Sequence, residues 1–172
     1  TLFHQEYEDF QLNSFLGTSF VVRSIPKVTS QGVDAEILWQ PRAVMGLMLQ
    51  GGLMYAKTEF GGSIPGCDFV GPGQTTPACP AVGQLFNLPG ATLPFAPEWS
   101  GSLAATYEWD FSDNLIGRFN IGGKYMGSYN TGSDLDVEKA QKAYTVFNAR
   151  FGFGRGDGRW MVELWGTNIT DT

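Results

Sequence analysis

Apolar and polar side chains alternate along most of this chain with a period of two residues. Between Met45 and Tyr55, for example, every second residue is apolar or glycine, and the intervening set includes Gln50. Successive side chains of a β-strand point to opposite faces, so this alternation is typical of a strand with one apolar and one polar face. The pattern predicts further strands at 33–39, 99–109, 115–125, 147–153 and 160–164. Across these predicted strands one face carries no charge.

A seventh strand is expected within residues 1–12, where the alternation is less regular. Phe3 and Tyr7 share one face, whereas Phe10 and Leu12 fall on the other. A β-bulge near residues 8–9 would account for this change of face.

The predicted connections alternate between long and short. The long ones span 13–27, 60–97 and 130–142, and the short ones span 40–43, 111–114 and 154–158. Asp113-Asn114 and Asp157-Gly158 are typical of tight hairpins. If the strands run up and down, all short turns lie on one side and all long loops on the other. Outer-membrane barrels have this asymmetry.

Aromatic residues gather near the ends of the predicted strands. One set lies beside the short turns and comprises Trp39, Trp109 and Trp160. A second set lies toward the long loops and comprises Trp99, Tyr55 and Tyr129. Two aromatic levels that flank an apolar band are typical of an aromatic girdle at the two membrane surfaces.

Composition supports a sheet that contacts lipid. Only 16% of the residues are charged, whereas 42% are hydrophobic and 14% aromatic. The net charge of −6 argues against a nucleic-acid partner. No segment is apolar over the length that a transmembrane helix needs. We therefore expect an all-β fold, an antiparallel transmembrane β-barrel. A soluble β-sandwich is one alternative, and it leaves the loop asymmetry unexplained. A soluble lipocalin-like binder is another, and it predicts a chain that stays soluble without detergent.

The polar face is the expected lining of the barrel lumen. The lumen-facing candidates are Glu36, Gln50, Glu108, Arg118, Lys124 and Arg150. No nucleophile motif, phosphate-binding loop or zinc-ligand spacing appears, so we expect no catalytic residues, no metal site, no cofactor and no enzymatic activity. His4, the one histidine, is expected to be a polar lumen residue rather than a metal ligand.

The longest predicted loop, 60–97, carries the remaining candidates. It holds seven of the nine prolines and one charged residue, Asp68. Cys67 and Cys79 would form a disulfide in an oxidising compartment, with free thiols or a metal-binding pair as the alternatives. Long loops over a rigid barrel commonly capture ligand, and a surface lid without ligand contact is the alternative. The ligand-loop candidates, which would suit an aromatic or amphiphilic ligand, are Phe69, Leu85, Phe86 and Phe95.

Four stretches resemble the C-terminal part of the barrel of TonB-dependent outer-membrane receptors. Leu2-Phe3 with Tyr-Glu-Asp-Phe-Gln at 7–11 resembles a strand of that family with an aromatic-acidic-Gln ending, and Gly-Val-Asp-Ala-Glu at 32–36 resembles its Gly-x-Glu-x-Glu strand start. Ala-Pro-Glu at 96–98 resembles the entry into a strand after a long outer loop. Residues 144–150 and 160–164, with Asn-Ile-Thr-Asp at 168–171, resemble the closing region.

The resemblance implies a function that the pattern alone does not give. Residues 1–172 would form about seven strands of a larger, 22-stranded, plugged barrel, with the plug domain and the last strand absent. The whole receptor, in the bacterial outer membrane, would bind a scarce nutrient (an iron–siderophore complex, cobalamin or a glycan) and import it with energy supplied by TonB. Its partners would be membrane lipid, its own plug, the TonB complex and the nutrient. A passive pore or an adhesin barrel without a plug is the alternative.

Overall fold

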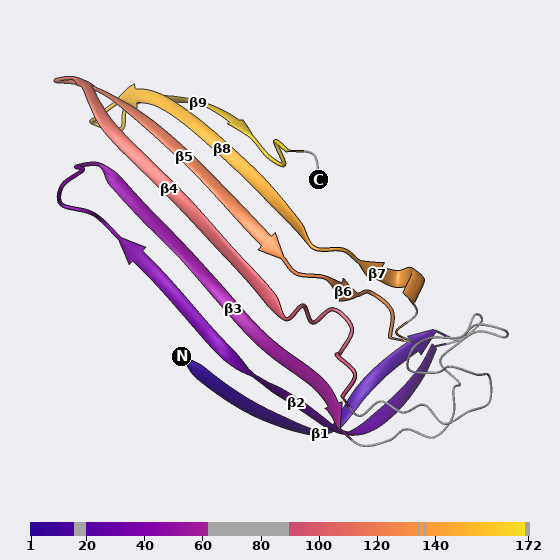
Figure 1. Ribbon diagram of the computed structural model, residues 1–172. Helices are drawn as coiled ribbons and strands as arrows, with labels where there is room; N and C mark the ends of the chain where they lie inside the picture. Colours follow the sequence, from indigo (N-terminus) through magenta and orange to yellow (C-terminus); the bar gives the residue numbers. More distant parts are fainter. Residues whose placement is uncertain (16–19, 62–89, 134, 136, 171–172) are drawn as a thin grey trace. The chain divides into compact units, whose positions relative to one another are not determined.

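The chain folds into an antiparallel β-sheet, as the alternation predicts (Figure 1). The computed structural model describes residues 1–15, 20–61, 90–133, 135 and 137–170. Seven strands follow one another in the order β1-β2-β3-β4-β5-β8-β9. Their bounds are β1 Leu2–Phe15, β2 Phe20–Trp39, β3 Leu47–Gly61, β4 Trp99–Ser112, β5 Leu115–Met126, β8 Tyr144–Arg155 and β9 Met161–Gly166.

The connection between β5 and β8 contains a small separate hairpin. Its strands β6 (Tyr129–Asn130) and β7 (Ala140–Gln141) pair with each other, and a 3-10 turn at Val137–Lys139 lies between them. Among the described residues, no helix is long and apolar enough to cross a membrane.

The contacts divide the chain into two compact units. The first unit comprises Thr1–Val33, Tyr55–Glu98 and Gly127–Ala143, and the second comprises Asp34–Met54, Trp99–Met126 and Tyr144–Thr172. Strands β2 and β3 contribute residues to both units.

In the first unit, β1 and β2 form a longer ladder than the sequence predicts. Pairing continues from Leu2 opposite Val33 to Phe15 opposite Phe20. The prediction of a loop at 13–27 is therefore wrong, because most of these residues belong to β1 and β2. The described pairing leaves only residues 16–19 between β1 and β2.

The expected β-bulge in β1 is also wrong. The pairs Glu8–Lys27 and Phe10–Ile25 lie in one unbroken register, so no residue is inserted between them. The irregularity is instead Asp9, which has a φ of 51° and lies opposite Pro26 in this register. Proline has no N–H to donate to the ladder, and Asp9 adopts the left-handed region that Asp tolerates better than most residues.

A short stretch that precedes β4 runs along the end of β3 in the first unit. Phe60 donates its N–H to Ala91 O at 3.0 Å, and Gly90 donates its N–H to Phe60 O at 3.0 Å. Thr92 forms a β-bridge with Glu59. The small apolar core of this unit contains Ile25, Val28, Phe60 and Leu93.

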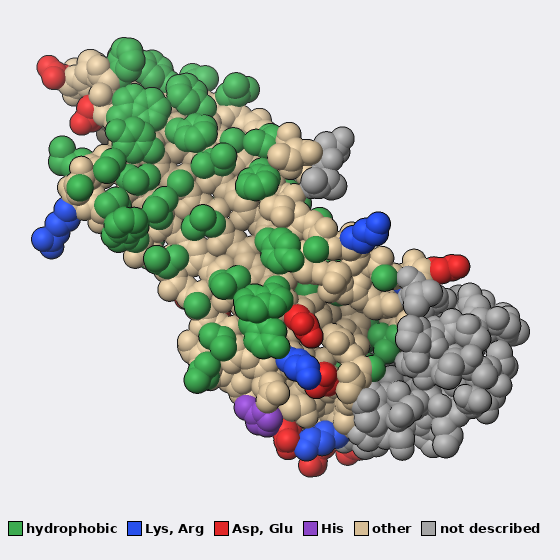
Figure 2. Space-filling view, viewed as in Figure 1, with side chains coloured by type: hydrophobic (Ala, Val, Ile, Leu, Met, Phe, Trp, Pro, Cys, Tyr) green, Lys and Arg blue, Asp and Glu red, His purple; other side chains and the backbone are tan. Residues whose placement is uncertain are grey.

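In the second unit, the pairing of β4, β5, β8 and β9 separates two faces. Residues directly opposite one another on neighbouring strands share a face. One such row is Tyr107, Phe119, Phe151 and Leu164, and the next is Trp109, Gly117, Phe153 and Val162. We call the surface formed by these and the parallel rows the apolar face. Figure 2 shows hydrophobic side chains gathered over these strands, with charged side chains toward the margins.

The short turns of the second unit form where the sequence predicts them, with one shift. β3 begins at Leu47 rather than at Met45, because Gly46 takes a φ of 83° and Leu47 donates its N–H to Val44 O at 3.3 Å. In the β8–β9 turn, Gly158 has a φ of 74° and Asp157 Oδ1 accepts the N–H of Arg159 at 3.1 Å. The β4–β5 ladder carries a register shift between Asp110 and Ser112.

Beyond β9 the chain stays attached to β8. Asn168, the first residue of the Asn-Ile-Thr-Asp stretch, has a φ of 49°. Its N–H donates to Asn148 Oδ1 at 2.9 Å, and the N–H of Ile169 donates to Phe147 O at 3.0 Å. Asn is one of the few residues that visit the left-handed region readily, which gives this stretch a structural reason for its asparagine.

Candidate functional site

The second face of the second unit, which we call the polar face, collects charges and amides. It contains the row Glu108, Arg118, Gly152 and Glu163, and the row Thr106, Asn120, Arg150 and Trp165. Alternation along each strand places these residues on the side opposite the aromatic rows. The polar face is therefore a consequence of the same register that builds the apolar face.

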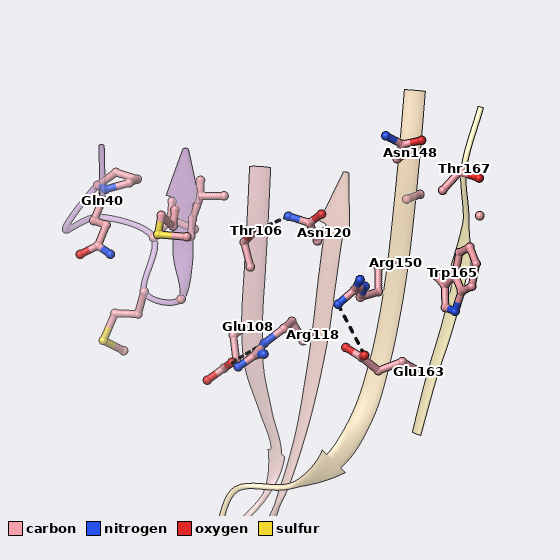
Figure 3. A pocket seen from close by; sticks show the side chains of 18 of the residues that line it. Gln40, Thr106, Glu108, Arg118, Asn120, Asn148, Arg150, Glu163, Trp165 and Thr167 are labelled. Atoms are coloured by element: carbon pink, nitrogen blue, oxygen red, sulfur yellow. Dashed lines mark hydrogen bonds and ion pairs between the residues drawn. The ribbon is translucent and has the colours of Figure 1, made fainter. Parts of the chain in front are cut away.

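Cross-strand pairs on the polar face join β4 to β5 and β8 to β9 (Figure 3). Arg118 donates from both Nε and Nη2 to Glu108 Oε2, at 2.9 and 2.6 Å. Arg150 Nη1 lies 3.6 Å from Glu163 Oε2 on β9. Asn120 donates from Nδ2 to Thr106 Oγ1 at 2.7 Å. These groups form a band of partly exposed hydrogen-bonding groups across four strands.

A hollow of about 970 Å³ lies over this band. The β2–β3 turn borders it through Gln40, Pro41 and Arg42, and the far side ends at β9 with Trp165 and Thr167. Trp165 is 67% exposed and stands opposite Arg150. A broad aromatic surface beside arginines and carboxylates can bind a partner that offers both apolar area and hydrogen-bonding groups.

A second hollow of about 480 Å³ lies on the polar face beside Lys124. Asp34 and Glu36 of β2 and Ser102 of β4 also line it. Charges of both signs therefore face this space, and a partner would meet an acidic strand on one side and a lysine on the other.

The structure brings five of the six lumen-facing candidates to these two hollows. Glu108, Arg118 and Arg150 line the larger hollow, and Glu36 and Lys124 line the smaller. Gln50 is exposed on β3. A Cβ on its neighbour Gly51 would lie 3.1 Å from Leu103 and 3.6 Å from Ile37, so alternation places Gln50 on the polar side.

Sequence reasoning missed the most unusual residue of the polar face. Trp165 follows Glu163 by two positions, so simple alternation would have placed it there. Its aromatic character favours the apolar face instead, where alternation along 160–164 puts Trp160, Val162 and Leu164. Asn148 and Thr167 also line the larger hollow. Nothing in the sequence except their polarity predicts this position.

Three of the four predicted girdle tryptophans lie near strand ends with substantial exposure. Trp39 ends β2 at 54% exposed, Trp99 begins β4 at 46%, and Trp160 precedes β9 at 43%. Trp109 is less exposed and stacks on Tyr107, with ring centroids 5.6 Å apart. The cluster continues through Phe151, which lies 6.1 Å from Trp109.

Of the ligand-loop candidates, the structure describes Phe95. Its side chain is 67% exposed and its φ is 59°, an unusual value for a bulky residue. The N–H of Phe95 donates to Asn130 O at 2.8 Å, and its ring lies 6.3 Å from that of Tyr129. Five further predicted residues lie outside the described residues: the ligand-loop candidates Phe69, Leu85 and Phe86, and the cysteine pair, Cys67 with Cys79.

The first unit carries exposed ion pairs on β1, β2 and β3. Lys27 Nζ lies 2.8 Å from Glu6 Oε1, and this ammonium lowers the pKa of the Glu6 carboxyl. Lys57 Nζ lies 2.8 Å from Glu59 Oε1, and that carboxylate raises the pKa of Lys57. His4 hydrogen-bonds Gln31 at 3.3 Å through Nδ1. Because these groups are solvent-exposed, the pairs contribute little to stability.

The described residues do not assemble a metal site. No group of three or more His, Cys, Asp or Glu side chains among them could hold an ion. The chemistry that the polar face offers is reversible binding through hydrogen bonds, ion pairs and one exposed indole.

Comparison with known families gives a match over nearly the whole chain. The family model described as TonB dependent receptor-like, beta-barrel, matches residues 1–169. No curated protein and no solved structure matches the chain.

Proposed function

Because this chain belongs to the TonB-dependent receptor β-barrel family, we propose that the whole receptor imports a scarce nutrient, an iron–siderophore complex in the first instance. Cobalamin and a glycan are the other nutrients that we consider. The family places the chain in the bacterial outer membrane and makes it part of an active transporter rather than an enzyme. Import in this family draws on TonB.

The observation that carries the proposal is the contrast between the two faces of the second unit. Tyr107, Phe119 and Phe151 form an uncharged surface suited to lipid, and the opposite face holds Glu108, Arg118 and Arg150. A transmembrane barrel of this kind needs an apolar exterior and a polar interior. The polar face would therefore line the lumen, and its two hollows would receive the plug domain and the passing ligand.

Phe95 supports ligand capture at the long-loop side. A large aromatic residue held in a left-handed conformation and left 67% exposed is costly for the fold. The hydrogen bond to Asn130 and the contact with Tyr129 stabilise this arrangement. We infer that the two rings offer a fixed aromatic surface to a ligand with planar or apolar parts, as many siderophores have.

The partners follow from the same proposal. Residues 1–172 would be one part of a larger barrel, and the plug and the closing strand would belong to the same receptor. TonB would act through the plug rather than through the strands described above. Membrane lipid would cover the apolar face.

Growth under iron limitation tests the nutrient. Cells that depend on a supplied ferric siderophore should stop growing when the complete receptor is deleted, and should stop equally when TonB is removed. Parallel cultures that depend on cobalamin or on an oligosaccharide test the other nutrients. Siderophore-dependent growth that persists without the receptor would contradict the iron assignment. Leakage of small solutes through the receptor that is unaffected by TonB removal would favour a passive pore.

A further inference from the structure

The apolar face of the second unit is not flat, because glycines interrupt its rows of side chains. Gly101 stands opposite Tyr125, and Gly123 stands between Leu103 and Phe147 on the neighbouring strands. Side chains of the neighbouring strands lean over these glycines, because a Cβ at Gly101 would lie 3.3 Å from Leu53 and a Cβ at Gly123 would lie 2.8 Å from the Phe147 ring. The surface is still lower at these positions, which carry no side chain of their own. The result is a groove of about 370 Å³.

The walls of this groove are side chains that project from the sheet. Leu53 is 51% exposed and Leu103 is 62% exposed, so each projects from the sheet, although Leu53 partly covers Gly101. Phe147 forms the wall on β8, and Tyr125 lies beside it on β5. The lining contains no charged residue.

The groove lies near the strand ends that adjoin the long connections. Gly101 is two residues from the start of β4, and Tyr125 is one residue from the end of β5. In outer-membrane barrels the long loops are extracellular, so this end of the strands meets the outer leaflet. The groove is continuous with the rows of the apolar face that the family places against lipid.

We propose that this groove binds one acyl chain of an outer-leaflet lipid. An extended methylene chain in the groove contacts apolar side chains on both sides, among them Leu53 and the Phe147 ring that lies over Gly123. A chain on the flat part of the same face contacts protein on one side only. Dispersion contacts are individually small and add up with number, so the chain in the groove exchanges more slowly than its neighbours.

Photolabelling tests this lipid site in the complete receptor. The receptor is reconstituted in nanodiscs that contain a phospholipid with a diazirine on its acyl chain, and the labelled residues are mapped by mass spectrometry. Phe147 and Phe119 are matched reporters on the apolar face, because they are 36% and 38% exposed. Phe147 lines the groove and Phe119 does not. We expect severalfold more labelling at Phe147.

Truncating two of the side chains that form the walls provides the decisive variant. Leu53→Ala combined with Leu103→Ala should reduce the labelling of Phe147 to that of Phe119. The control Ile121→Ala, on the same face outside the groove, should preserve the excess. Heat-modifiable migration on gels verifies that each variant is folded. Equal labelling of the two phenylalanines in the unmodified receptor, or an excess that survives wall removal, would overturn the proposal.

Discussion

At the scale of single residues, Gly117 shows how a missing side chain shapes the apolar face. A Cβ at this position would lie 2.3 Å from the Trp109 ring, which covers the glycine from the neighbouring strand. The same relation joins Gly123 and Phe147, where a Cβ would lie 2.8 Å from the ring. Aromatic rings that cover glycines bury backbone and help to hold the register of the strands.

We predict that Gly117→Ala destabilises the receptor by about 1–3 kcal/mol, because the Trp109 ring must move away from its neighbours. The matched control is Gly122→Ala on the same strand, where the nearest atom to a new Cβ is 3.4 Å away. Urea unfolding of the receptor refolded into lipid vesicles, followed by tryptophan fluorescence, measures both. Equal free energies of unfolding for the two variants would mean that the position of the Trp109 ring does not require a glycine at residue 117.

Trp165 shows that residue type alone can indicate the wrong face of a strand. Alternation assigns it to the polar face with Glu163, and the pairing with Arg150 agrees. Its hydrophobicity favours the apolar face. The pairing of β8 with β9 shows that Trp165 lies on the polar face. Phe95 is a similar case, because nothing in the sequence around it predicts a left-handed backbone.

At the scale of elements, the strands of the second unit were predictable and the length of the first hairpin was not. In β4 and β5 one face is free of charge, and in β8 the same face is free of charge as far as Phe153, so a period of two identifies strand and face together. The part of the β1–β2 ladder between 13 and 27 lacks this contrast, so the sequence pattern predicts a loop there. The ladder continues beyond Pro26 in an unchanged register, because Asp9 on the opposite strand adopts a left-handed backbone conformation.

The cross-strand pairs of the polar face should contribute little to stability. Glu108 and Arg118 are 42% and 43% exposed, so solvent screens their attraction. We predict that Arg118→Glu lowers the free energy of unfolding by roughly 1 kcal/mol or less, since it places two carboxylates opposite each other. Adding Glu108→Arg should restore the original value. The same urea titration measures this, and a loss that the second substitution does not restore would show that Arg118 has another essential partner.

At the scale of the whole molecule, the two units differ in where their apolar side chains lie. The first unit encloses a small core around Phe60 and Val28 and leaves its ion pairs exposed. The second unit exposes its apolar residues on one face, and Leu103 and Leu164 are 62% and 76% exposed. Such exposure is tolerable in lipid and unfavourable in water. We therefore infer that the exposed apolar face of the second unit is a lipid-contacting surface.

A pair of arginine substitutions in β3 of the complete receptor tests this assignment most directly. Leu49→Arg puts a charge on the apolar face, where an arginine costs about 2–4 kcal/mol at the bilayer midplane. Gln50→Arg puts the same charge on the polar face one residue away. Assembly is measured as the heat-modifiable receptor recovered in the outer membrane. The account predicts that Leu49→Arg reduces assembly strongly and that Gln50→Arg assembles normally. Equal assembly of the two variants, or the reverse order, would contradict it.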